Sequence, residues 1–225
     1  MAKSKIIKEL ANNEISLEVA INRLLIIASD INNKELSQWA EQELNGYTSE
    51  DTIPAYRIVK NTMFRYSGIN GRMKATNVPL PLKELLKGHD EDIFDMNIYD
   101  GIKTIEGFIN SDTDVQYGRD LTWAASMVYR MTGIQCYSIT QTVPENALEN
   151  TVNTVKTLLL KVLIQLDKSY GCMDDLDIDI TNKTPEEVTK LNTIINNYIF
   201  NDNSIKIGDK NKIKDTDILT GGTHK

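Results

Sequence analysis

Histidine, the side chain most often used as a base near neutral pH, occurs only twice in this chain of 225 residues. His224 is the next-to-last residue, and His89 stands in KGHDEDIFD with Asp90, Asp92 and Asp95. Imidazole and carboxylate groups bind metal ions, but this stretch has no second histidine at ligand spacing. We therefore interpret it as a solvated acidic loop and predict no metal site there.

A second group of acids matches part of a calcium-binding loop. Asp175, Asp177, Asp179 and Glu186 stand at positions 1, 3, 5 and 12 of that pattern. Position 6, where glycine allows the sharp turn, is Ile180, and a β-branched residue would be strained there. We predict no calcium site and interpret Glu186 as an acid in the first turn of a helix.

Motifs of the common catalytic sites are absent from the sequence. No serine lies in a GxSxG turn, and no phosphate-binding GxxxxGK[ST] segment is present. We identify no catalytic residues and no cofactor-binding motif. The residues therefore favour a non-enzymatic protein over a hydrolase or a nucleotidase.

A basic segment offers a nucleic-acid face. SGINGRMK contains the GxxG spacing of KH domains, and the net charge from Ala55 to His89 is +6, although that of the whole chain is −7. The candidate phosphate ligands are Lys60, Arg65, Arg72 and Lys74. A KH loop joins two helices, whereas Asn70-Gly71 predicts a hairpin that pairs 57–66 with 72–78. Nucleic-acid binding is therefore the second candidate function, and a metal-dependent enzyme built on the aspartates is the third.

The bulk composition is that of a globular protein. Hydrophobic residues make up 40% and charged residues 25%, and no apolar run approaches the ~20 residues of a membrane span. The first residues, MAKSKIIKELANNE, lack the apolar centre of an export signal. We expect a cytoplasmic protein with no membrane segment.

The elements that position these residues are mostly helices. Ser16 is the expected N-cap of one helix, and a second runs from Asn33 to a stop at Gly46. Strands are expected in the hairpin and in IQCYSITQTV, followed by a long helix from Pro144 to Tyr170. We predict an α+β, predominantly α-helical fold. It has a helical core and a small antiparallel sheet in residues 1–183, with a C-terminal helix and β tail in 184–225.

The tail predicts self-association. Thr184-Pro185-Glu186-Glu187 begins a helix whose seam contains Leu191 and Ile195. Beyond it, a Gly-Asp-Lys-Asn turn separates isoleucines at strand spacing, namely Ile205, Ile207, Ile213 and Ile218. A lone hairpin is marginal in water, so we expect a homo-oligomer assembled through residues 185–219. The alternative is a disordered tail, which its polar composition also favours.

The stretch from Glu35 to Val59, ELSQWAEQELNGYTSEDTIPAYRIV, resembles the AbiTii-type abortive-infection proteins of bacteria. The preceding ANNEISLEVAINRLLIIASDINN fits the family's first helix, and ENTVNTVKTLLLKVLIQLDKSYG is similar to its long helix, although members more usually carry an aromatic residue where this chain has Val162. The matching motif residues are Trp39, Glu43, Leu44, Asn45, Gly46, Tyr47, Pro54, Tyr56 and Arg57.

The resemblance implies a role in defence against bacteriophage, with an unidentified phage or host protein as trigger. It transfers no catalytic residues. The candidate partner-binding residues are Trp39, Asn45, Gly46, Tyr47, Tyr56 and Arg57. A helix stop with a packed tyrosine explains the Asn-Gly-Tyr segment equally well.

Overall fold

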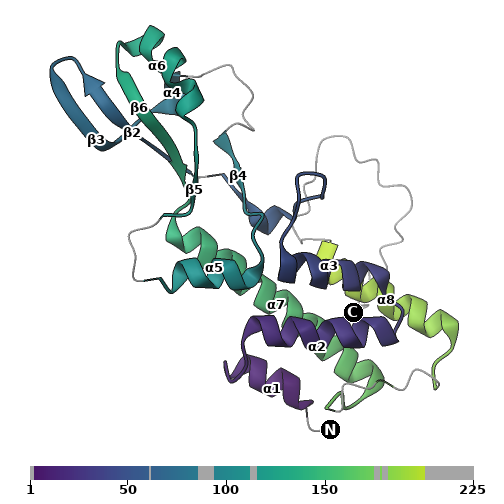
Figure 1. The fold of residues 1–225 in the computed structure, drawn as a ribbon. Helices are drawn as coiled ribbons and strands as arrows, with labels where there is room; N and C mark the ends of the chain where they lie inside the picture. Colours follow the sequence, from purple (N-terminus) through teal and green to yellow (C-terminus); the bar gives the residue numbers. More distant parts are fainter. Residues whose placement is uncertain are drawn as a thin grey trace, which may run out of the picture.

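The structure is a computed structural model that describes residues 3–60, 62–85, 94–111, 116–174, 178 and 182–200. A bundle of helices and a lobe built on a β-sheet lie at opposite ends of the molecule (Figure 1). This mostly helical α+β architecture confirms the predicted fold class. The bundle contains α1 (Lys5–Ala11), α2 (Leu17–Asp30), α3 (Lys34–Asn45), α5 (Ile102–Ile109), α7 (Glu145–Tyr170) and α8 (Pro185–Phe200). Within the described ranges, no helix is both long and apolar enough to cross a bilayer.

The lobe is a four-stranded antiparallel sheet in the order β3-β2-β6-β5. Its strands are β2 (Met63–Asn70), β3 (Met73–Pro79), β5 (Gly118–Asp120) and β6 (Gln135–Thr142). α4 (Leu82–Leu85) and α6 (Ala125–Thr132) supply side chains to a core that includes Tyr66 and Ile139, which face each other across β2 and β6. A short pair, β1 (Ile58–Val59) with β4 (Met96–Asn97), lies between lobe and bundle.

The hairpin is confirmed, but its turn and its first strand differ from the prediction. Asn70 pairs with Met73, so the two turn residues are Gly71 and Arg72, and Gly71 has a φ of +62°. Residues 55–57 form the short 3-10 helix η1 (Ala55–Arg57) instead of a strand, and β2 begins only at Met63. The GxxG segment therefore joins two strands, which is not the context of a KH loop.

Several helices begin or end at capping residues that can be recognised in the sequence. The Ser16 hydroxyl accepts a hydrogen bond from the Val19 N–H, as expected of an N-cap. At α8, the Thr184 N–H donates to the Glu187 carboxylate and the Glu187 N–H donates to the Thr184 hydroxyl, which is a capping box. α6 ends at Gly133, whose φ of +74° is left-handed. These four-residue signals act without tertiary context, so sequence alone located them.

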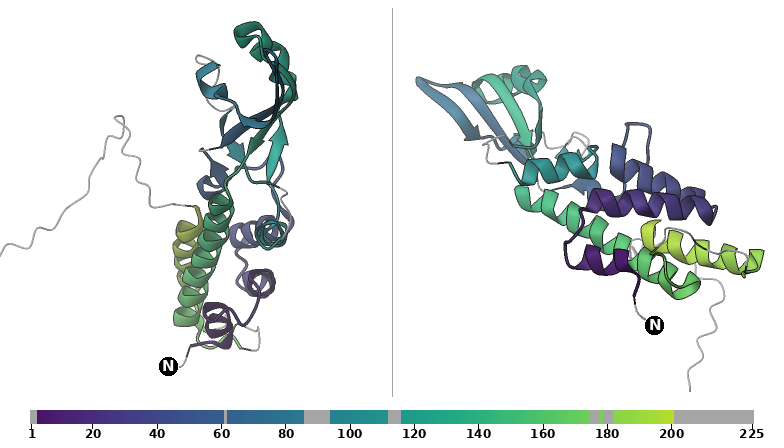
Figure 2. Two further views of the ribbon diagram at one scale, coloured as in Figure 1. Left: turned by 90° about the vertical axis from the view of Figure 1, so that its left-hand side faces the viewer. Right: turned by 60° about the horizontal axis from the view of Figure 1, so that its bottom comes forward.

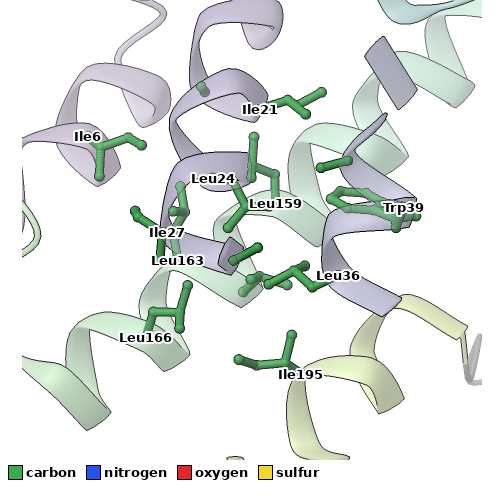
Figure 3. Close-up of a cluster of buried hydrophobic side chains, with 14 of the residues drawn as sticks. Ile6, Ile21, Leu24, Ile27, Leu36, Trp39, Leu159, Leu163, Leu166 and Ile195 are labelled. Atoms are coloured by element: carbon green, nitrogen blue, oxygen red, sulfur yellow. The ribbon is translucent and has the colours of Figure 1, made fainter. Parts of the chain in front are cut away.

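The bundle core is packed from α1, α2, α3, α7 and α8 (Figure 3). Its most enclosed side chains include Ile21, Leu24, Leu36, Trp39 and Leu159. α8 contributes Leu191, Ile195 and Ile199, which are at most 5% exposed, while Tyr198 of the predicted seam is 38% exposed. The prediction placed α8 in a separate tail with an interface of its own. The structure instead uses Leu191 and Ile195 inside the chain's own core.

The long helix α7 connects the two ends of the molecule. It follows β6 through Val143 and Pro144, and its 26 residues span ~39 Å. Its first turns pack near α5 through Leu148, and its later turns lie between α1 and α8 (Figure 2). α8 runs back along α7 in the opposite direction, so the end of α8 at Phe200 faces the lobe end of the molecule.

The α3 stop brings two backbone segments into close contact. Gly46 has a φ of +94°, and its N–H donates to the Gln42 carbonyl at 2.9 Å. The next N–H, that of Tyr47, donates to the Tyr99 carbonyl at 2.7 Å. A Cβ at Gly46 would lie 2.5 Å from the same Tyr99 oxygen. Glycine is therefore required here, because the φ angle is positive and because there is no room for a Cβ beside the Tyr99 carbonyl.

We expect Gly46→Val to lower the free energy of unfolding by about 2 kcal/mol or more. Valine is strained at a positive φ, and its Cβ would also clash with the Tyr99 carbonyl. Denaturant unfolding measures the change. The control is Gly107→Ala in α5, where a Cβ meets nothing within 4 Å, and which should stabilise by about 0.5–1 kcal/mol. Equal unfolding midpoints for Gly46→Val and wild type would show that this close contact does not form.

The N-terminal segment is fixed to α7 by one buried carboxylate. Asp167 accepts hydrogen bonds from the Ser4 N–H at 3.0 Å and from the Ser4 hydroxyl, and it pairs with Lys3 Nζ at 3.1 Å. The Ser4 hydroxyl in turn accepts from the Met173 N–H at 3.0 Å. Burial alone raises the pKa of Asp167, but the bonds from Ser4 and Lys3 outweigh it and hold the pKa below its ordinary value of 3.8.

A carboxylate whose pKa is lowered by folding stabilises the fold above its unfolded pKa and loses that effect as the pH falls through the folded pKa. We therefore expect Asp167→Asn to be less stable than wild type at pH 7, with the difference shrinking as the pH falls below about 3.8. Thermal unfolding across pH 2.5–7 measures it, with Asp30→Asn as the control at an exposed carboxylate. A difference that stays constant with pH would rule out the charge of Asp167 as its source.

Candidate functional site

The motif residues of α3 and η1 meet around the carboxylate of Glu43, which is 0% exposed. Glu43 Oε1 accepts from the hydroxyls of Tyr47 and Tyr56, each at 2.7 Å, and from Arg57 Nε at 3.3 Å. Glu43 Oε2 accepts from Arg57 Nη2 at 2.6 Å. The Trp39 indole N–H donates to the Tyr56 hydroxyl at 3.0 Å, which extends the group across α3.

Arg57 is also 0% exposed, and its hydrogen-bond partners lie inside the protein. Besides the two bonds to Glu43, its Nη1 donates to the carbonyls of Ile98 at 3.0 Å and Asp100 at 2.8 Å. Its guanidinium carbon lies 4.8 Å from the centre of the Tyr47 ring, which is a cation–π contact. Buried charges of this kind are stable only when paired and fully hydrogen-bonded, and this pair meets both conditions.

The electrostatics of this cluster make it unsuited to proton transfer. Burial and the neighbouring Glu43 charge raise the pKa values of Tyr47 and Tyr56 far above their ordinary range. Burial alone lowers the pKa of Arg57, but Glu43 outweighs that effect and raises it. The tyrosines therefore stay protonated donors and Arg57 stays charged at any physiological pH. The cluster fixes geometry and has no open position for a substrate.

The candidate partner-binding residues are thus mostly interior. Trp39, Tyr47 and Arg57 are 1%, 6% and 0% exposed, and a partner cannot reach them without unfolding the region. Asn45 is exposed, and Tyr56 is half-buried. The burial of Trp39, Tyr47 and Arg57 favours the packed-tyrosine alternative for these three residues, and a recognition surface at the exposed ones stays a prediction. Sequence reasoning gave no role to Glu43, although its charge, opposite to that of Arg57, was the available signal.

The basic candidates occupy the sheet lobe. Lys60, Arg72 and Lys74 are exposed, and the last two lie at the tip of the β2–β3 hairpin. Arg65 is half-buried, and its Nη1 donates to the Asn77 carbonyl at 2.8 Å. The structure therefore gathers two of the four residues at one exposed tip and uses a third to hold the hairpin.

Other predicted sites lie outside the described residues. The predicted oligomerisation residues Ile205, Ile207, Ile213 and Ile218 lie there, and so do His89, Asp90, Asp92, Asp175, Asp177 and Asp179, at which we predicted no metal site. In the ranges that the structure does describe, no group of three or more His, Cys, Asp or Glu residues is arranged to hold a metal ion.

An acidic cleft lies at the junction of lobe and bundle. It consists of two hollows of about 700 and about 970 Å³, which share the lining residues Phe108, Gln116, Tyr117, Gly118 and Arg119. Four carboxylates line it, those of Asp95, Asp100, Asp120 and Glu145. The cationic Arg119 is occupied by the protein, since its Nε donates to Gln141 Oε1 at 2.7 Å and its Nη2 donates to the Asp95 carbonyl at 3.2 Å.

Several large apolar side chains of the lobe between residues 123 and 137 are exposed. Trp123 and Tyr137 are each 60% exposed, and Tyr129 and Met131 are each 54% exposed. They come from the 3-10 helix η3 (Thr122–Ala124), α6 and β6, which follow one another in the chain and contact one another. We call these four residues the aromatic surface. Single exposed apolar residues are ordinary, whereas contiguous apolar patches typically mark binding sites.

The buried pair predicts a large loss of stability when one charge is removed. We expect Glu43→Gln to lower the free energy of unfolding by about 3–5 kcal/mol, because it leaves the Arg57 charge buried without a counter-charge. Urea unfolding measures this. The control, Glu18→Gln, removes a surface pair with Lys103, whose side chain is 74% exposed, and should change stability little. Similar small effects for both variants would mean that water reaches Arg57.

Comparisons with known proteins give one match. No curated protein and no solved structure matches the chain. The family model AbiTii matches residues 4–194, which include the Glu43–Arg57 cluster, the whole sheet lobe and most of α8. Because this match covers more than half of the sequence, the chain belongs to the AbiTii family of abortive-infection proteins, which act in defence against phage.

Proposed function

We propose that this AbiTii protein acts in phage defence through contacts with other proteins, including copies of itself, and not through a reaction of its own. The observation that carries the proposal is the aromatic surface. Trp, Tyr and Met are the residue types that dominate the centres of protein interfaces, and here each of the four is more than half exposed. The defence role itself comes from the family.

Charge around the aromatic surface supports a protein partner. From Leu121 to Pro144 the sequence contains no acid and a single base, Arg130. Interface centres are depleted in charge, except for arginine. A surface that binds phosphates would need several clustered cations, and residues 121–144 supply only one.

Self-association through α8 alone has no support in the packing. Leu191 and Ile195, the expected contact residues, are buried in the bundle core. If copies of the chain associate, they do so through other surfaces. The aromatic surface is one candidate, and the tail beyond Phe200 is another.

Nucleic-acid binding remains the alternative function. Arg72 and Lys74 favour it, because both are exposed at the hairpin tip and no acid lies beside them in the sequence from Met63 to Lys83. Such binding would weaken steeply with salt, whereas contacts through the aromatic surface would not.

We expect Trp123→Ala combined with Tyr137→Ala to abolish protection against a phage that the wild type restricts, while the melting temperature stays unchanged. Loss of two central anchors typically weakens an interface by about thirty-fold or more. Plaque counts on cells that produce each variant at equal level measure protection. The matched control is Ile26→Ala with Tyr198→Ala, which removes two exposed apolar side chains from the bundle.

The alternative function makes the opposite prediction. Wild-type protection in the Trp123/Tyr137 variant, with protection lost in Arg72→Glu combined with Lys74→Glu, would contradict our proposal. Salt-sensitive retention of RNA or DNA by the purified protein would then establish the nucleic-acid function.

A further inference from the structure

Two consecutive segments of the chain carry opposite charge. Residues 35–56 contain five acids and no base, namely Glu35, Glu41, Glu43, Glu50 and Asp51. Residues 58–83 contain five bases and no acid, namely Lys60, Arg65, Arg72, Lys74 and Lys83. Arg57, between the segments, neutralises Glu43 inside the protein. The acidic segment is therefore left with a charge of −4 and the basic segment with a charge of +5.

The fold carries the two segments to different parts of the molecule. Most of the basic segment forms the β2–β3 hairpin, whose tip projects away from the bundle, whereas α3 of the acidic segment lies within the bundle (Figure 1). The hairpin tip of a molecule therefore cannot reach its own α3. A contact between these opposite charges requires a second copy of the chain.

The hairpin tip, residues 71–74, has the composition of a protein-binding surface. Arg72 and Lys74 are exposed, and within the described residues neither side chain has a hydrogen bond or an ion pair. Between them, Met73 is 72% exposed, the highest value among the large hydrophobic side chains of the described residues. Met and Arg are enriched at protein interfaces, and residues 69–79 include no aromatic side chain on which a nucleic-acid base could stack. The tip therefore fits a protein surface of negative charge.

Such a surface lies at the C-terminal end of α3. The Gln42 amide donates to Asp51 Oδ1 at 2.9 Å, which holds the turn after α3 against the helix. The neighbouring residues Glu41 and Glu50 therefore lie at the same end of α3, and both are exposed without a side-chain hydrogen bond or an ion pair in the described residues. Asn45, one turn after Glu41, is exposed as well. The carbonyl end of the helix dipole adds to the negative potential here.

We propose that the hairpin tip of one copy binds the C-terminal end of α3 in a second copy, with Arg72 and Lys74 beside Glu41 and Glu50. This inference rests on the contacts between copies in the proposed function, and it names the two surfaces that make them. Because the two surfaces differ, each copy offers one of each, and copies join head to tail. The paired charges lie at the protein surface, so the association is weak and sensitive to salt.

Static light scattering of the purified full chain measures this association. At about 0.1 mM protein and about 0.05 M salt, we expect a mass above that of a monomer. At about 0.5 M salt the mass should fall to that of a monomer, because the exposed charges are then screened.

A charge swap tests the two surfaces together. Arg72→Glu combined with Lys74→Glu makes the tip acidic, and Glu41→Lys combined with Glu50→Lys makes the end of α3 basic. Each pair variant alone should associate about ten-fold more weakly or less at low salt, since its tip and its α3 end then carry charge of the same sign. An equimolar mixture of the two should associate again, because the tip of each variant is complementary to the α3 end of the other.

The matched control is Lys161→Glu combined with Lys190→Glu, which changes the net charge by as much as the tip variant does, at two exposed lysines of α7 and α8. It should keep the wild-type mass. A monomeric wild type at low salt, association that both pair variants retain, or a mixture that stays monomeric would each overturn the inference.

Salt-sensitive retention of RNA or DNA by a monomeric wild type would overturn it as well, and would identify nucleic acid as the ligand of the tip. None of these measurements depends on Trp123 or Tyr137. Failure of this inference is therefore distinguishable from failure of the proposed function, which the plaque counts test.

Discussion

The buried pair of Glu43 and Arg57 is the interaction on which the arrangement of bundle and lobe depends. Arg57 donates two hydrogen bonds to Glu43 and one each to the carbonyls of Ile98 and Asp100, and these four bonds join three segments that are distant in sequence. Tyr56 adds a fourth, because its carbonyl accepts a bond from the Thr151 hydroxyl of α7 at 3.0 Å. Such a pair contributes less net stability than apolar packing of equal size, but it tolerates only one geometry. That geometry sets where the chain leaves the bundle and enters the lobe.

The rest of the junction follows from this constraint. Gly46 ends α3 directly beside Tyr99, and Gly101 lies so close that a Cβ there would be 2.2 Å from the Leu44 carbonyl. Both glycines allow the segment after β4 to approach α3 closely enough for Arg57 to reach the carbonyls of Ile98 and Asp100. α7 begins at the same junction, where Leu148 packs in one apolar core with Met96 and Ile98. The acidic cleft is a product of this meeting, since β4, β5 and the start of α7 supply its walls.

Sequence reasoning succeeded where the determining forces are local. The N-cap at Ser16, the stops at Gly46 and Gly133, and the capping box at Thr184 each depend on a few neighbouring residues, and the structure confirms them. It failed where the outcome depends on distant partners. The strand predicted over 57–66 is broken, because Arg57 turns inward to Glu43 at the end of a 3-10 helix and β2 begins only at Met63. The seam of α8 had the spacing of an interface between copies, and periodicity alone cannot tell such a seam from one that packs on α7 of the same chain.

The same distinction explains why the residues that identify the family are not the ones that meet a partner. Trp39, Glu43, Tyr47 and Arg57 carry the resemblance because a buried charged cluster admits few substitutions, and each of its members must fit all the others. A surface that binds a partner is under a different constraint, set by that partner. The exposed Trp123 and Tyr137 lie in elements for which no such motif was apparent, and their position followed only from the packing of α6 on β6. The motif therefore specifies how the lobe is held, and the exposed residues of the lobe are the ones that we propose to meet a partner.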